Sequence, residues 1–171
     1  QEYITVPWQK ILLAPNLNEL ELAMVEPLTV GFHAIQRGRV EEPDVVMVLG
    51  CGMIGAGAIA AASQRGATVI AVDIDNHKLE LARELGAQYT INSNVTDIHQ
   101  ELERLTNGDG PDVVVEAAGN PLTYRLAVDE VAYTGRVVCI GYAGGEVSFA
   151  TKLFVQKEID IMGSRNATPE D

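Results

Sequence analysis

The stretch from residue 45 to residue 73 constrains the fold of this chain more than any other. Val45–Leu49 is a continuous apolar run, which is typical of a strand buried on both faces of a sheet. The turn Gly50-Cys51-Gly52-Met53-Ile54-Gly55 follows and fits the pattern G-x-G-x-x-G. A helix rich in small residues is expected over 53–65, and a second buried strand over 68–72 leads to Asp73. A strand–helix–strand unit of a parallel sheet is therefore predicted.

Each glycine of this turn has a physical task. Gly50 allows a tight turn off the strand, Gly52 removes a side chain where backbone must approach a pyrophosphate, and Gly55 lets the helix pack close to the sheet. The first helical turn, at Met53 and Ile54, offers free N–H groups and the positive end of the helix dipole to phosphates. The glycine pattern alone is weak, but the flanking strands and helix supply the context that dinucleotide binding needs.

An acidic residue ends the second strand. Asp73 lies 18 positions beyond Gly55, where its carboxylate can accept the hydroxyls of a ribose and would repel a 2′-phosphate. The predicted ligand is therefore NAD rather than NADP. Lys78 follows at the start of the next helix, and it either reaches the same ribose or is one of several solvated charges on that helix.

The rest of the chain continues to alternate strands and helices in two similar halves. Helices are expected over 76–85, 96–105 and 120–132, and strands over 88–91, 112–116, 136–140, 146–149 (a short edge strand) and 158–162. This order predicts an α/β fold with a doubly wound, parallel, six-stranded sheet, the Rossmann fold.

The two ends suggest a longer protein. Tyr3–Pro7 is strand-like, and Thr168-Pro169 followed by two acids is typical of the start of a helix. We therefore expect residues 1–16 to be the remnant of a strand from a further, catalytic domain. Residues 17–40 are expected to form a helical connecting segment and residues 41–171 the Rossmann domain.

Composition excludes some partners. The 171 residues carry a formal net charge of −12, which disfavours nucleic acid and anionic membranes as partners. No apolar run reaches the roughly 18 residues of a membrane span. Cys51 and Cys139 lie within apolar runs, so we expect both to be buried and reduced, which suits the cytoplasm.

Two longer segments resemble a known family. Val45–Ala87 and Gly110–Gly119 resemble the cofactor domain of the medium-chain dehydrogenases/reductases, and the resemblance extends over nearly the whole chain. Glu26–Val30 and Glu158–Asn166 are similar to the zinc-dependent branch that acts on polyols and sugar acids, such as sorbitol, idonate, galactonate and threonine dehydrogenases. The resemblance implies a protein that transfers a hydride from a secondary alcohol of a polyol or sugar acid to NAD.

The resemblance also implies roles for individual residues. Ile54 would approach the pyrophosphate, and Asp73 and Lys78 would bind the adenosine ribose. The residues implied to lie near the nicotinamide or its ribose are Ile140, Gly141, Tyr142, Ser164, Arg165 and Asn166. Both groups follow predicted strands, and ligands of such sheets bind at the carboxyl ends of the strands.

The zinc site of this family is mostly missing from the sequence. Glu26 matches a Glu that lies near the catalytic zinc and sometimes ligates it, although a lone Glu on a helix is usually just solvated. The family's Gly-His-Glu segment is absent, and His33, His77 and His99 lack metal-ligand spacing. We therefore assign no catalytic residue and expect the chain to bind NAD without turning over an alcohol.

The family also pairs edge strands in dimers, and 146–149 is the candidate strand here.

Two other readings compete with this one. A nucleotide-sensing Rossmann module also shows a glycine-rich turn and a distal Asp, but it would not need the Glu26-Pro27 lead-in or the 163–166 segment. A methyltransferase that binds S-adenosylmethionine also uses such a turn. That class usually lacks the third glycine and ends in an antiparallel hairpin.

Overall fold

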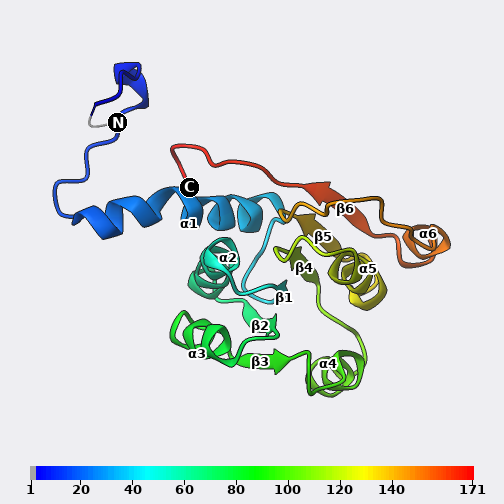
Figure 1. The fold of residues 1–171 in the computed structure, drawn as a ribbon. Coiled ribbons are helices and arrows are strands. Elements are labelled where there is room, and N and C mark those ends of the chain that lie inside the picture. Colours follow the sequence, from blue (N-terminus) through cyan, green and yellow to red (C-terminus); the bar gives the residue numbers. More distant parts are fainter. Residues whose placement is uncertain (1–2) are drawn as a thin grey trace.

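The computed structural model describes residues 3–171, and its centre is a six-stranded parallel sheet (Figure 1). The strand order is β3-β2-β1-β4-β5-β6, so the chain winds outward from β1 first in one direction and then in the other. The strands are β1 (Val45–Leu49), β2 (Thr68–Asp73), β3 (Tyr89–Asn92), β4 (Val113–Glu116), β5 (Arg136–Cys139) and β6 (Asp160–Gly163). The predicted doubly wound fold is confirmed. Because β6 pairs with β5 in parallel, the antiparallel hairpin of the methyltransferase reading is absent from the described residues.

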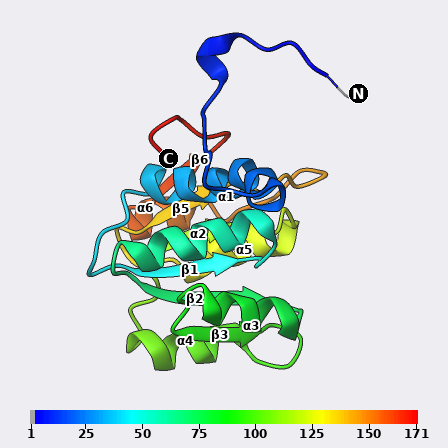
Figure 2. The same cartoon turned by 90° about the vertical axis from the view of Figure 1, so that its left-hand side faces the viewer.

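Helices cover both faces of the sheet (Figures 1 and 2). One apolar cluster joins the sheet to α1, α2 and α3, and a second joins its opposite face to α4 and α5. The long helices are α1 (Glu19–Arg37), α2 (Met53–Gln64), α3 (Asn76–Glu84), α4 (Ile98–Thr106) and α5 (Pro121–Glu130). The central strands β1 and β4 are buried on both faces, as their continuous apolar runs predict.

The connecting helix α1 is fixed at its start and along its length. Asn18 and Glu21 form a capping box, in which the Asn18 side chain accepts from the Glu21 amide at 3.0 Å and Glu21 accepts from the Asn18 amide at 2.8 Å. Further along, Gly31 lies so close to α2 that a Cβ there would overlap the backbone of Ala58, and Gly57 of α2 faces α1 in the same way. The two helices therefore meet through glycine backbone.

One predicted strand is wrong and one helix was missed. Residues 146–149 pair with no strand, and the edge of the sheet is β6 instead. Val147 and Phe149 are half-buried while Glu146 and Ser148 are exposed, so the alternation reflects burial of one side of an irregular segment. The short helix α6 (Lys152–Lys157) follows, and the rings of Phe149 and Phe154 pack with their centroids 6.0 Å apart.

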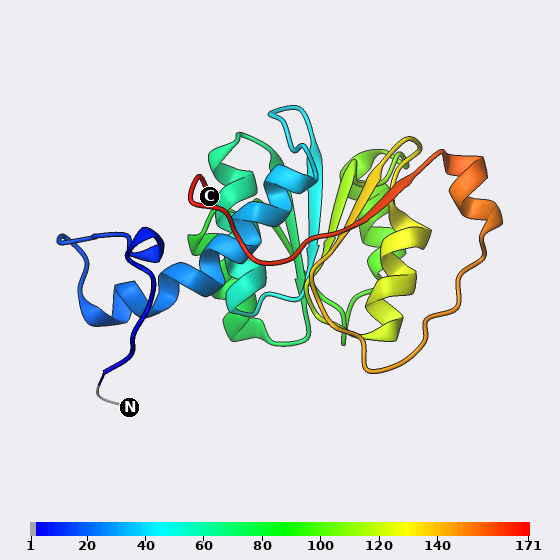
Figure 3. The ribbon, with the colours of Figure 1, turned by 90° about the horizontal axis from the view of Figure 1, so that it is seen from above.

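The expectations for the chain ends also need correction. Tyr3–Pro7 forms no strand, and a short 3-10 turn, η1 (Trp8–Lys10), follows it in an exposed segment that extends away from the sheet (Figure 1). Residues 168–171 form a turn rather than the start of a helix. There the Asp171 carboxylate accepts from the Thr168 amide at 2.6 Å and contacts His33 of α1 at 2.9 Å. The carboxyl-terminal segment thus crosses over α1 (Figure 3).

None of the helices between residues 3 and 171 combines the length and the apolar character that crossing a bilayer requires.

Candidate cofactor site

The glycine-rich turn between β1 and α2 has the geometry that its sequence predicts. Gly50 has φ +93°, a conformation that side chains with a Cβ rarely adopt. A Cβ at Gly55 would overlap the carbonyl oxygen of Gly50, so only glycine lets the helix begin this close to the strand end. These two positions fix the path of the backbone between strand and helix.

The start of α2 presents backbone groups to open space. Gly52 is the N-cap residue and offers no side-chain cap, and no atom of residues 3–171 lies within 4 Å of where its Cβ would be. The first helical hydrogen bond runs from the Ala56 amide to the Gly52 carbonyl at 2.7 Å, so the amides before it, including those of Met53 and Ile54, have no helical acceptor. Unpaired amides at a helix N-terminus form a site for a phosphate group.

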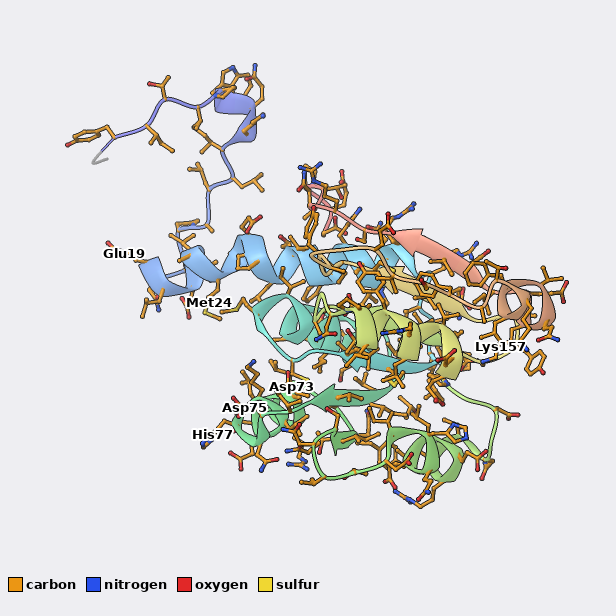
Figure 4. All side chains as sticks on the ribbon, turned by 45° about the vertical axis from the view of Figure 1, so that its right-hand side comes forward. Glu19, Met24, Asp73, Asp75, His77 and Lys157 are labelled. Atoms are coloured by element: carbon orange, nitrogen blue, oxygen red, sulfur yellow. The ribbon has the colours of Figure 1, made fainter. Side chains whose placement is uncertain are left out.

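The strand-end acid is held rigidly beside this turn. One oxygen of Asp73 accepts from the Cys51 amide at 2.7 Å, and the other accepts from the amides of Ile74 at 2.8 Å and Asp75 at 3.0 Å. A carboxylate has about four acceptor sites, so roughly one remains for a ligand hydroxyl unless an amide is displaced. Figure 4 labels Asp73, which ends β2, beside Asp75 and His77 at the start of α3. Asp73 therefore both orders the turn and faces the ligand space.

A hollow of about 380 Å³ brings several of the predicted residues together at the carboxyl ends of the strands. Gly50, Gly52, Asp73 and the exposed Lys78 all line it. The remaining lining residues were not predicted from the sequence; they are Leu49, Val72, Ile74, Ser93, Ile98, Ala117, Ala118, Asn120, Thr123 and Leu126. Ser93 and Ala117–Asn120 follow β3 and β4, so the rule that ligands bind at strand carboxyl ends was a signal that could have found them.

Four of the other predicted residues line a second hollow, of about 550 Å³, at the ends of β5 and β6. Ile140, Gly141, Tyr142 and Ser164 lie in its wall. The hydroxyl oxygen of Ser164 is buried and has no hydrogen-bond partner among residues 3–171. Arg165 and Asn166 are exposed and follow Ser164 outside the wall. Of the thirteen predicted cofactor residues, four line each hollow, and Met53, Ile54, Gly55, Arg165 and Asn166 line neither.

Residues 3–171 do not gather a metal site. No group of three or more His, Cys, Asp or Glu side chains that could hold a metal ion occurs in this part of the chain. Glu26 is exposed on α1, and its backbone carbonyl accepts from the Thr29 hydroxyl at 2.9 Å. The described residues therefore do not by themselves fit a zinc ion, and we derive no step through one.

A family model described as zinc-binding dehydrogenase matches residues 54–171. The chain belongs to this family. It is 41% identical over 166 residues to the D-xylulose reductase of Scheffersomyces stipitis, and the aligned region covers 95% of this chain and 46% of that protein. It is 33% identical over 170 residues to the L-galactonate-5-dehydrogenase of Escherichia coli, and this aligned region covers 99% of this chain and 50% of that protein. The resemblance to zinc-dependent medium-chain polyol dehydrogenases is confirmed.

A solved structure of the same fold contains a nicotinamide cofactor. It is described as a short chain alcohol dehydrogenase from Escherichia coli CFT073 complexed with NADH, and its TM-score is 0.88 at 25% identity. The match covers 96% of this chain and 49% of that one. The chain spans about half the length of the relatives it matches. The expected cofactors, NAD and zinc, agree with this zinc-binding dehydrogenase family.

The thiols of Cys51 and Cys139 are both held in their protonated form. Burial, together with the charge of Asp73, raises the pKa of Cys51 to about 12, and its Sγ contacts the Val72 carbonyl at 3.7 Å. Burial and the charge of Glu116 raise the pKa of Cys139 to about 11. Cys51 is buried, as predicted, whereas Cys139 is only half-buried, and both are free. Neither thiol is suited to nucleophilic chemistry at neutral pH.

Proposed function

We propose that this chain is the cofactor-binding part of a zinc- and NAD-dependent dehydrogenase that oxidises a secondary alcohol of a polyol or sugar acid. One observation carries the proposal: Asp73 and the open amino-terminus of α2 line one hollow at the strand ends. An acid positioned for the ribose and free amides for the pyrophosphate together match one NAD molecule. The named activities of the relatives support the substrate class.

The two hollows divide the cofactor between them in this proposal. The adenosine and pyrophosphate lie in the hollow of Gly52, Asp73 and Lys78, and the nicotinamide lies against the backbone of Ile140–Tyr142 and near Ser164. Arg165 and Asn166 then face the nicotinamide ribose. When bound, NAD supplies the hydride acceptor, and the residues of this chain bind and orient it.

The cofactor preference gives the first prediction. In a titration of the 171-residue chain, NADH should bind more tightly than NADPH, because the charge of Asp73 repels a 2′-phosphate. The Asp73→Ala variant should bind NADH about tenfold to a hundredfold more weakly, since it loses a charge-assisted hydrogen bond. Its affinity for NADPH should fall less, so that the NADH to NADPH ratio narrows.

The matched control for this experiment is Asp109→Ala, which removes an exposed carboxylate from a loop outside this hollow. That variant should leave both affinities unchanged. An unaltered NADH to NADPH ratio in Asp73→Ala would show that Asp73 does not select the cofactor.

The second prediction concerns turnover. The 171-residue chain should bind NAD but reduce none of it when supplied with sorbitol, xylitol or L-galactonate and Zn²⁺. The reason is that residues 3–171 gather no metal site that could activate the alcohol. NADH formation followed by absorbance is the measurement, and zinc-dependent production of NADH would refute the prediction.

Assembly and location complete the proposal. The free edge of β6 is the surface through which two copies would pair, in place of residues 146–149. The two free thiols favour a reducing compartment, the cytoplasm.

A further inference from the structure

Glu116 is the most deeply buried acidic residue of the described chain, and it has no role in the proposed function. It is the last residue of β4, and its exposed fraction is 0%. No ion pair among residues 3–171 includes it. A carboxylate without a cationic partner is costly to bury, so a residue of this kind needs a reason to be there.

One oxygen of Glu116 organises the loop after β4. Oε1 accepts from the amides of Ala118 at 3.1 Å and Gly119 at 2.9 Å, and from the hydroxyl of Thr123 at 2.7 Å. Ala118 and Thr123 line the hollow assigned to the adenosine and pyrophosphate. A single oxygen thus holds both the loop and the first turn of α5 in place.

The other oxygen of Glu116 faces the loop after β5. Oε2 is buried, with no hydrogen-bond partner in the described part of the chain, and it lies 2.6 Å from the position that a Cβ on Gly141 would take. The Gly141 amide donates to the backbone carbonyl of Glu116 at 3.0 Å, and the Gly141 carbonyl accepts from the hydroxyl of Tyr124. Gly141 therefore packs directly against the carboxylate.

Beside this carboxylate, the loops after β4 and β5 are in close backbone contact. A Cβ on Gly141 would overlap the Gly119 amide, and a Cβ on Gly119, which has φ +68°, would lie 2.8 Å from the carbonyl oxygen of Tyr142. The position of the backbone at 140–142 is thus set by the loop that Oε1 holds. Burial raises the pKa of Tyr124 to about 12, so its hydroxyl remains a donor to Gly141.

We infer that Glu116 is a positioning residue for the nicotinamide half of the cofactor site. The Glu116 side chain extends from β4 and fixes the loop after β4. That loop in turn positions the 140–142 backbone, against which the nicotinamide is proposed to bind. The required property is the length of the side chain, which places Oε1 among three donors, rather than its negative charge. This inference rests on the proposed function, because it assumes that the nicotinamide binds at 140–142.

Two conservative variants separate reach from charge. Glu116→Gln keeps the reach and an acceptor oxygen but removes the charge, whereas Glu116→Asp keeps the charge and withdraws the carboxylate by one methylene. The probes are NADH, which has both halves of the cofactor, and ADP, which ends at the pyrophosphate. ADP serves as the internal control because the groups proposed to bind it, Asp73 and the amides at the start of α2, are not among the hydrogen-bond partners of Glu116. Ala118 and Thr123 line the same hollow, so a small change in ADP affinity is expected and the comparison is between the changes for the two probes.

We expect Glu116→Asp to bind NADH about tenfold more weakly while its ADP affinity changes by less than about threefold. Glu116→Gln should bind both probes within about threefold of the unaltered chain. The fluorescence change of NADH on binding should be retained in the Gln variant and lost in the Asp variant. Circular dichroism should confirm that both variants are folded.

The other outcomes overturn the inference in recognisable ways. Equal weakening of NADH and ADP by Glu116→Asp would indicate a general structural role. Equal weakening of NADH by both variants would show that the charge matters rather than the reach. If the unaltered chain bound neither probe, the proposed function itself would fail, whereas tight ADP binding with an unchanged NADH to ADP ratio in both variants would refute only the role of Glu116.

Discussion

The Gly31→Ala variant is expected to lose about 3 kcal/mol of its free energy of unfolding, at the upper end of what overpacking a core costs. A Cβ at Gly31 would overlap the amide nitrogen of Ala58 and the carbonyl oxygen of Ile54, both of which belong to the backbone of α2. Side chains can rotate away from a clash, but a helix backbone can move only as a whole. Helix α1 must therefore separate from α2, exposing the buried residues Ala34 and Ile35.

Urea unfolding followed by circular dichroism measures this loss. Gly144→Ala is the matched control, because Gly144 is exposed and nothing lies within 4 Å of its would-be Cβ. The same methyl group there should be neutral or stabilise the chain slightly, since alanine restricts the unfolded state. A Gly31→Ala variant as stable as the control would show that the helices are not in backbone contact.

The sequence alone was enough to predict the central sheet and the turn at its middle. The strands Val45–Leu49 and Thr68–Asp73 could be predicted because strands buried on both faces need continuous apolar runs. The turn was predictable because its glycines meet local backbone requirements, such as the positive φ of Gly50. Features of this kind depend on residues that are close in the sequence, so they can be predicted from it.

Features that depend on residues far apart in the sequence could not be predicted from it. Gly31 only weakens a helix locally, and its purpose lies in a contact with α2 more than 20 residues away. Val147 and Phe149 alternate with polar residues as a strand would, yet alternation reports a buried side and not a paired backbone. Glu116 looks in the sequence like the polar end of a strand, because its contact with Gly141 joins the ends of two different strands.

The Gly52→Val variant should lose NADH binding by about a hundredfold while remaining folded. The space beside Gly52 is empty in the structure, and its φ of −68° suits any residue, so a larger side chain meets no protein atom. The isopropyl group would instead fill the space in front of the free amides at the start of α2. The pyrophosphate could then no longer reach those amides, and their hydrogen bonds to it would be lost.

This variant separates binding from stability, which Gly31→Ala cannot do. Its unfolding free energy should fall by no more than about 1 kcal/mol, because valine is a poorer N-cap residue than glycine. Gly144→Val adds the same group to an exposed loop and should bind NADH normally. Since ADP also carries the pyrophosphate, Gly52→Val should weaken ADP as strongly as NADH, in contrast to Glu116→Asp. If Gly52→Val bound NADH as tightly as Gly144→Val, the phosphates would have to bind somewhere other than the amino-terminus of α2.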